Sequence, residues 1–171
     1  MKNKRLLLIT LMLIASVSLF AATSFPSFVG TDLSGNPVDD SIFKGKVTVV
    51  NFWFSTCPPC IAELSELDKL NKELQAKGGM VIGINVDTLD DNEKMIEKAK
   101  SILKTKGATY RNITFPSSTE ASKFVRTIMA YPTTYVVDKN GNIVGSPIVG
   151  GITSRSLKRR LLETIDKAYA M

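Results

Sequence analysis

The 171-residue sequence contains no histidine and only two cysteines, Cys57 and Cys60. A tetrahedral zinc site takes four nitrogen, sulfur or oxygen ligands, so two thiolates alone do not complete one. The cysteines enclose only two residues, and a disulfide across so short a loop adds little stability, because the stabilisation grows with loop length. The pair is therefore expected to do redox chemistry without a cofactor, with copper carriage on two thiolates as an alternative.

The sequence also lacks a strong charge imbalance. It has 22 Lys plus Arg against 16 Asp plus Glu, and three of the basic residues (Lys2, Lys4 and Arg5) precede an N-terminal apolar stretch. Without those three, the chain carries a net charge near +3. That charge indicates no polyanionic partner, so we expect no nucleic-acid binding. The basic run 158–160 falls in a predicted helix and is interpreted as its solvated face.

Residues 1–22 have the layout of a secretory signal peptide. The basic residues are followed by an apolar stretch from Leu6 to Phe20 and then by small residues that suit cleavage. The stretch is long for a signal peptide, so an uncleaved anchor that tethers the protein to a membrane is the alternative. Either way, we expect the domain at 26–171 to be exported, to the periplasm or the outer face of the cytoplasmic membrane, and to be a monomer.

The two cysteines lie where a predicted strand passes into a predicted helix. Val47 to Phe54 is an apolar, β-branched and aromatic run, and leucines then recur at helical spacing (Leu64, Leu67, Leu70 and Leu74). The first turn of a helix offers free N–H groups and the positive end of the helix dipole, which lower the pKa of a thiol below about 8.5. Cys57 is therefore the candidate attacking sulfur. Cys60, one turn further in, is placed to displace whatever becomes bound to Cys57.

Pro58 and Pro59, between the cysteines, limit this stabilisation. Proline suits the first helical turn but has no N–H, so neither residue can donate a hydrogen bond to the Cys57 thiolate. The N–H groups of Cys60 and Ile61 are then the nearest donors. We expect the pKa of Cys57 to be only moderately lowered and the couple not to be strongly oxidising.

One acidic residue lies on the apolar face of the predicted helix. At ~100° per residue, Glu63 falls within the same arc as Cys60 and the leucines, whereas Glu66 and Glu73 fall outside it. Burial raises the pKa of a glutamate above its usual ~4.3, which would make Glu63 a proton acceptor for the Cys60 thiol. The alternative is a glutamate at the edge of the core with no role.

The rest of the chain alternates between predicted strands and helices. A turn signal at 34–37 predicts a hairpin within 28–38. Further strands are expected at 47–54, 80–86, 110–115, 131–137 and 143–149, and helices after the cysteines and at 90–106, 119–129 and 154–170. This order predicts an α/β fold: a mixed central sheet with helices on both faces, an N-terminal β-hairpin and an extra helical insertion.

Two segments resemble those of a known family. Residues 51–60 (Asn-Phe-Trp-Phe-Ser-Thr-Cys-Pro-Pro-Cys) and 131–134 (Tyr-Pro-Thr-Thr) are similar to the active-site and proline-loop motifs of TlpA/ResA-like thiol-disulfide oxidoreductases of the thioredoxin superfamily. The similarity spans residues 26–168. It implies a thioredoxin-like fold, a cis Tyr131–Pro132 bond beside the disulfide, pairing of the Tyr131 backbone with substrate, and Glu63 as the acid of the site. It further implies substrate contacts from Trp53, Pro58, Pro59, Tyr131 and Thr133.

Two positions depart from the family pattern. Cytoplasmic thioredoxins usually carry a buried aspartate in the active-site strand, where this chain has Asn51. That departure strengthens the case for Glu63. The usual tryptophan before the first cysteine is Thr56 here, so the apolar docking surface beside Cys57 does not carry over with the resemblance.

Three functions follow as hypotheses. The first, implied by the resemblance, is an exported enzyme that reduces disulfides of other exported proteins, as in cytochrome c maturation or thiol repair, with electrons from a CcdA-like membrane donor. The second is a peroxiredoxin-like peroxidase, but its Pro-x-x-x-Thr-x-x-Cys pattern needs proline and threonine where the chain has Val50 and Phe54. The third is a copper metallochaperone, which the lack of histidine and of methionine near Cys57 disfavours.

Overall fold

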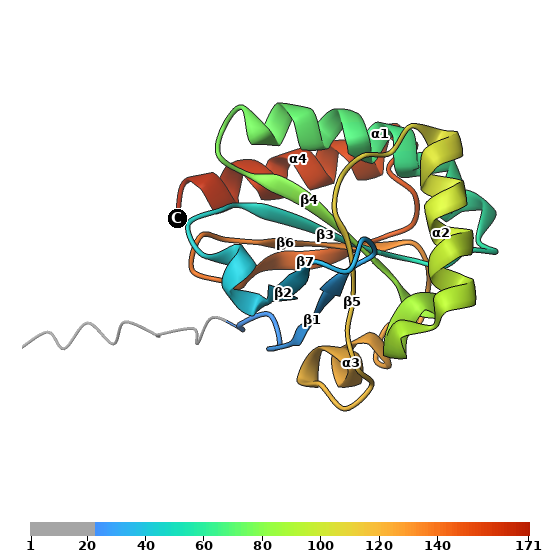
Figure 1. Cartoon of the computed structure of the whole chain (residues 1–171). Coiled ribbons are helices and arrows are strands. Elements are labelled where there is room, and N and C mark those ends of the chain that lie inside the picture. The colour runs from blue at the N-terminus through green and yellow to red at the C-terminus, as the bar shows by residue number, and fades with distance from the viewer. Residues whose placement is uncertain (1–22) are drawn as a thin grey trace, which may run out of the picture.

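Seven strands form one mixed sheet in the computed structural model, which describes residues 23–171 (Figure 1). In spatial order they are β2 (Pro37–Asp39), β1 (Val29–Asp32), β5 (Asn112–Thr114), β4 (Met80–Asn85), β3 (Thr48–Trp53), β6 (Thr133–Val137) and β7 (Ile143–Val149). The helices are α1 (Pro58–Gln75), α2 (Glu93–Lys106), α3 (Glu120–Val125) and α4 (Arg155–Tyr169), with 3₁₀ turns η1 (Asp40–Phe43) and η2 (Val86–Asp91). The predicted α/β class is confirmed. The predicted signal peptide, 1–22, lies outside the described residues.

Strand β3 lies at the centre of the sheet and fixes which residues face which layer. It pairs in parallel with β4 and antiparallel with β6. Because side chains alternate along a strand, Val49 and Trp53 enter the core on one face of the sheet, whereas Val50 and Phe52 enter the core on the other. Asn51 shares the face of Val49 and Trp53, so an amide lies in the layer beneath α1.

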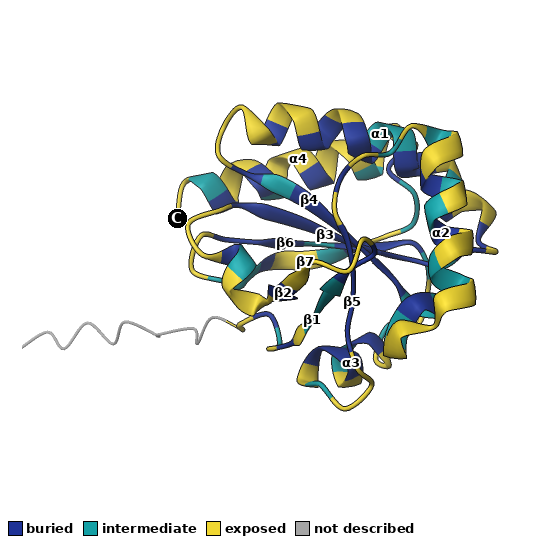
Figure 2. Ribbon diagram, in the orientation of Figure 1, coloured by how far each residue is buried: buried dark blue, intermediate teal, exposed yellow. Residues whose placement is uncertain are grey.

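Helices α1, α2 and α4 cover that face of the sheet (Figure 1). The core here joins the predicted leucines of α1 to residues of the other two helices, namely Leu64, Leu67, Leu70, Leu74, Ala99, Leu103, Leu161 and Ile165. Figure 2 shows that the outer sides of the same helices are largely exposed. Burying each leucine contributes about 1.5–3 kcal/mol, so this layer holds the active-site helix firmly against the sheet.

Aromatic rings form the core on the opposite face. Phe25 lies 4.9 Å from Phe43 of η1 and 6.4 Å from Phe52, measured between ring centroids. Phe124 of α3 lies 6.1 Å from Phe52. Helix α3, turn η1 and the segment before β1 therefore cover this face, so the prediction of helices on both faces is confirmed.

The predicted N-terminal hairpin lies at one edge of the sheet. Strands β1 and β2 pair antiparallel, and β1 also pairs antiparallel with β5. The Asp32 carboxylate closes the turn by accepting hydrogen bonds from the N–H groups of Ser34 and Asn36, at 2.9 and 3.0 Å. The hairpin thus extends the sheet beyond the parallel strands.

Two predicted helices have different bounds in the structure. The helix expected at 90–106 begins at Glu93, because Asp90 and Asp91 adopt left-handed φ angles of 60° and 54°, which a helix does not accommodate. The helix expected at 119–129 ends at Val125, ahead of a turn that leads to Pro132, and the residue before a proline disfavours helix. Among residues 23–171, no helix is long and apolar enough to cross a membrane.

Candidate active site

The two cysteines form a disulfide at the start of α1. Cys57 is the N-cap residue, with an extended backbone, and Pro58 and Pro59 occupy the first helical turn. The N–H of Cys60 donates to the Cys57 sulfur at 3.3 Å, as expected. The prediction for Ile61 was wrong, because its N–H donates to the carbonyl of Cys57 at 3.0 Å. One backbone donor, rather than two, is therefore directed at the sulfur.

The two sulfurs differ in their access to solvent. Cys57 is 3% exposed and Cys60 is fully buried, whereas Thr56, Pro58 and Pro59 around Cys57 are exposed. A protein substrate can approach Cys57 across these neighbours but cannot reach Cys60 directly. This arrangement suits Cys57 as the attacking sulfur and Cys60 as the resolving one, and those roles remain a prediction.

The segment before Cys57 is held by residues that follow β4. The N–H of Ser55 donates to the carboxylate of Asp87 at 2.8 Å, and the Asn85 amide donates to the Ser55 hydroxyl at 3.0 Å. The Asp87 N–H in turn donates to the Asn85 side chain at 2.9 Å. No expectation from the sequence included this group. The signal was available, because the predicted strands 47–54 and 80–86 flank a predicted helix, which favours parallel neighbours whose carboxyl ends meet at one edge of the sheet.

Glu63 is fully buried beneath the disulfide-bearing turn. Its Oε1 accepts a hydrogen bond from the Asn51 amide at 2.8 Å, and its Oε2 accepts one from the Ile152 N–H at 2.7 Å. Burial raises the pKa of Glu63 to about 7, although both hydrogen bonds act to lower it. The predicted buried acid is thus confirmed. Its proposed exchange of a proton with Cys60 remains a prediction.

Asn51 links Glu63 to the neighbouring strand. It lies opposite Thr134 of β6 in the sheet register, and its amide donates to the Thr134 hydroxyl at 3.0 Å as well as to Glu63. The amide oxygen of Asn51 is buried and has no hydrogen-bond partner among the described residues. Asn51 occupies the strand position at which cytoplasmic thioredoxins carry an acid. In this chain its amide instead donates a hydrogen bond to the acid on α1, Glu63.

The proline loop reaches the same end of the sheet. The Tyr131–Pro132 bond is cis, as the resemblance implied. The Pro132 carbonyl accepts the Gly150 N–H at 2.8 Å, which joins this loop to the segment that supplies Ile152. The half-buried Tyr131 ring lies edge-on to Phe54, with centroids 5.4 Å apart. Burial, and secondarily the charge of Asp87, raise the pKa of Tyr131.

Two residues expected to contact substrate are not on the surface. Trp53 is fully buried, and its indole N–H donates to the Asn112 side chain at 2.9 Å. Thr133 is 3% exposed, and its hydroxyl donates to the Ala130 carbonyl at 2.8 Å. The Trp53 side chain therefore supports the site from within, which corrects the expectation that it contacts substrate. Thr133 is as exposed as Cys57, so its contact with substrate stays a prediction. Pro58, Pro59 and Tyr131 remain accessible.

Among residues 23–171, no group of three or more histidine, cysteine, aspartate or glutamate side chains is arranged to hold a metal ion.

Comparison with known proteins places this site in a family. The family model described as AhpC/TSA family matches residues 21–146. The thioredoxin-like protein YneN of Bacillus subtilis is 30% identical over 138 residues, which is 80% of this chain and 75% of that protein. The thiol-disulfide oxidoreductase ResA of Geobacillus kaustophilus is also 30% identical, over 80% of this chain and 73% of that protein.

A solved structure shows the same architecture. The thioredoxin domain of a thiol-disulfide oxidoreductase from Bacteroides vulgatus superposes with a TM-score of 0.64 at 26% identity, covering 86% of this chain and 99% of that one. The thioredoxin-like fold is therefore confirmed. A peroxidatic site needs proline and threonine at the positions where this chain has Val50 and Phe54. The chain therefore has the thioredoxin-like fold but lacks the peroxidatic sequence pattern. The chain belongs to the AhpC/TSA family and, within it, is a thioredoxin-like thiol-disulfide oxidoreductase with the redox pair Cys57–Cys60.

Proposed function

We propose that this protein is an exported reductant of disulfides in other proteins. In the first step the Cys57 thiolate attacks one sulfur of the substrate disulfide. A bond forms between Cys57 and that sulfur, and the other substrate sulfur leaves as a thiolate. In the second step Cys60 attacks the Cys57 sulfur and releases the substrate as a dithiol. The protein ends as the Cys57–Cys60 disulfide, and two electrons have passed to the substrate.

One observation carries this proposal: the buried carboxyl of Glu63, whose pKa is raised to about 7. The buried Cys60 thiol must lose its proton before it can attack. A general base is most effective when its pKa lies near the working pH. Glu63 meets that condition and lies, like Cys60, on the buried face of α1.

The reductant role requires a source of electrons, because each turnover leaves the protein oxidised. We assign this role to a CcdA-like membrane donor, as the family resemblance implies, and we assign export to residues 1–22. Reduced protein in intact cells should then react with a thiol reagent that cannot cross membranes. Labelling only after lysis would place the protein inside the cell and overturn this part of the proposal.

The reduction potential of the Cys57–Cys60 couple tests the direction of electron flow. A reductant should equilibrate with thiol buffers near about −250 mV, whereas a value near about −120 mV would indicate an oxidant. The single N–H directed at Cys57 supports the lower value, because weak thiolate stabilisation makes the reduced form less favoured. Peroxide consumption by the same reduced sample serves as a control for the peroxidase alternative.

Trapping experiments test the assignment of the two sulfurs. Cys60→Ser should accumulate mixed disulfides between Cys57 and partner proteins, because the second step is blocked. Cys57→Ser should accumulate none, since Cys60 is fully buried. Non-reducing gels and mass spectrometry report the adducts, and equal trapping by both variants would reverse the roles.

A further inference from the structure

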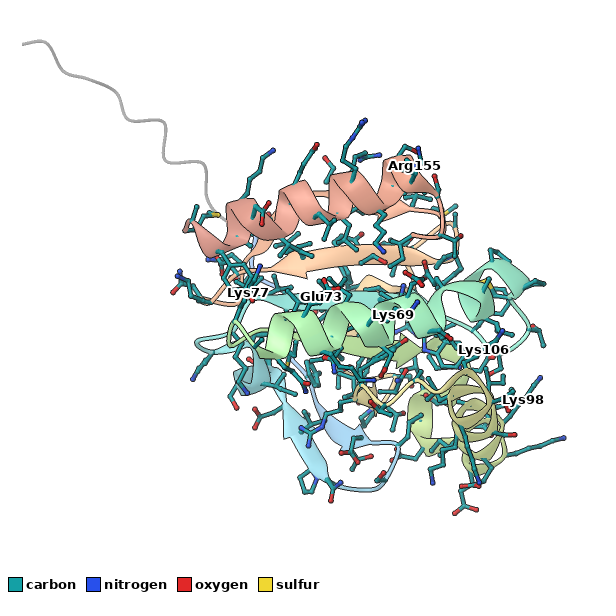
Figure 3. The ribbon with its side chains drawn as sticks, turned by 90° about the horizontal axis from the view of Figure 1, so that it is seen from above. Lys69, Glu73, Lys77, Lys98, Lys106 and Arg155 are labelled. Carbon is teal, nitrogen blue, oxygen red and sulfur yellow. A yellow bond between two sulfur atoms is a disulfide. The ribbon has the colours of Figure 1, made fainter. Side chains whose placement is uncertain are left out.

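An open cavity of about 400 Å³ lies beside the active site, between α1 and the start of α4. Glu66, Ile152, Thr153, Arg155 and Lys158 line it. Helices α1 and α4 lie side by side on this face of the sheet, and Figure 3 marks Arg155 at the start of α4. A cavity of this size is ample for a single amino-acid side chain.

The cavity is joined to the catalytic residues by the loop after β7. Ile152, which lines the cavity, donates its N–H to Glu63 at 2.7 Å. A methyl group added to Gly151 would lie 3.6 Å from the Pro59 carbonyl oxygen and 3.7 Å from Glu63 Oε2. The loop is thus in contact with the turn that bears the disulfide. A substrate chain attached to Cys57 would pass close to the cavity mouth.

The lining carries excess positive charge. Glu66 is shared by two lysines, with its oxygens 3.0 Å from Lys158 and 2.7 Å from Lys69, so one carboxylate faces two ammonium groups. Arg155 has no acidic group within ion-pairing distance among residues 23–171. A guanidinium can bind a carboxylate through two parallel hydrogen bonds. An anionic group entering the cavity therefore meets an unpaired guanidinium and a net positive surround.

The other side of the site has the opposite sign. Asp87 holds the Ser55 N–H just before Cys57 and lies close enough to Tyr131 for its charge to act on that hydroxyl. A substrate with an acidic residue near its disulfide would be repelled on the Asp87 side and attracted on the Arg155 side. The negative charge on the Asp87 side and the positive charge on the Arg155 side together favour one orientation of such a substrate chain.

We propose that the cavity receives an aspartate or glutamate side chain of the substrate polypeptide, a few residues from its disulfide, and that Arg155 is its main contact. This inference rests on the proposed function and names the substrate class: protein disulfides flanked by acidic residues. Lys158 already forms an ion pair with Glu66, so it contributes only to the positive charge around the cavity.

A panel of disulfide-bonded peptides tests the inference with the full chain. The peptides differ at a single residue, which is Glu, Gln or Lys. That residue stands at one of two positions, one before and one after the disulfide, and kcat/KM is measured for each peptide. The wild type should reduce the Glu peptide about threefold to tenfold faster than the Lys peptide at one or more positions, and high salt should shrink that ratio. Arg155→Glu should invert the order there while leaving the Gln peptide within about twofold.

Lys167→Glu is the matched control, because it makes the same charge change in the last turn of α4, twelve residues from Arg155. It should keep the wild-type order. Arg155→Glu should also fold, since an acidic residue in the first turn of a helix is favourable. No order among the peptides at any position, or an order that Arg155→Glu leaves unchanged, would overturn the inference. Failure to reduce even the Gln peptides would instead overturn the proposed function.

Discussion

The two faces of the central sheet differ in what they bury. On the face covered by α3 and η1, the rings of Phe25, Phe28, Phe43, Phe52 and Phe115 form an aromatic core. On the face covered by α1 and α4, the apolar core is interrupted by Asn51, Glu63 and Thr134, all fully buried, and the Asn51 amide donates a hydrogen bond to each of the other two. The interruption lies beneath the disulfide.

A buried carboxyl lowers stability unless its hydrogen bonds compensate for lost hydration. Glu63 has both oxygens bonded, yet burial still dominates its pKa. A core that only had to hold the fold together could place an apolar residue there, as α1 does at Leu64 and Leu67. The aromatic face thus contributes stability, whereas the polar group on the other face lowers it, which fits the proton-accepting role proposed for Glu63.

The largest effect is expected on the aromatic face. Phe52→Ala removes a fully buried ring that packs against Phe25, Phe124 and Tyr135, which should lower the free energy of unfolding by about 3–5 kcal/mol. The reduction potential should stay at the wild-type value, because the ring lies across the sheet from the sulfurs. Urea unfolding and thiol-buffer equilibration measure the two quantities. A shifted potential would show that the faces are not independent.

The next effect concerns Glu63 and the pH dependence of stability. Because its pKa is raised from 4.5 to about 7 in the folded protein, the folded state binds the proton more tightly than the unfolded state. Stability from this group is therefore greatest below pH ~4.5 and is lost as pH rises through ~7, by up to about 3 kcal/mol. The chain has no histidine, so few other groups titrate in this window.

Glu63→Gln should remove that dependence. The variant should unfold with nearly the same free energy at pH 5 and pH 8, and at pH 8 it should be more stable than the wild type, while its resolving step slows by about 100-fold or more for lack of a base. Urea unfolding across the pH range and single-turnover kinetics are the measurements. A wild-type profile that is flat, or that rises between pH 5 and 8, would contradict the raised pKa.

Sequence reasoning reached the parts of this site that depend on local pattern. The strand at β3, the leucine spacing of α1 and the position of Glu63 on its buried face all follow from periodicity. Trp53 shows a signal that was present but unused: alternation along β3 puts it on the same side as Val49, inside the core. Trp53 lies close to the cysteines in the sequence, which suggested that it contacts substrate at the surface. Its position in β3 places its side chain in the core instead.

Other features required the assembled fold. Glu63 bonds to Ile152, which lies 89 residues away, and Asn51 bonds to Thr134, which lies 83 residues away. No local pattern encodes these distances. The same holds for Asp90, whose left-handed backbone is accompanied by a hydrogen bond from the Ser117 N–H to its carboxylate and which a helical periodicity could not anticipate.

The smallest effect is expected from Asn51, the donor between Glu63 and β6. Asn51→Leu removes the hydrogen bond to Glu63 Oε1, so the carboxylate is less stabilised and its pKa should rise further, by about one unit. The same change removes a buried amide oxygen that has no partner among the described residues, which offsets about 1–3 kcal/mol of unfavourable burial. Stability should therefore change little while the pH inflection of the resolving step moves upward.

Thr134→Val removes only the other contact of the Asn51 amide and should leave that inflection nearly in place. An inflection that Asn51→Leu does not move would show that the hydrogen bond from Asn51 does not lower the pKa of Glu63, and it would leave Asn51 as a packing residue of the polar face.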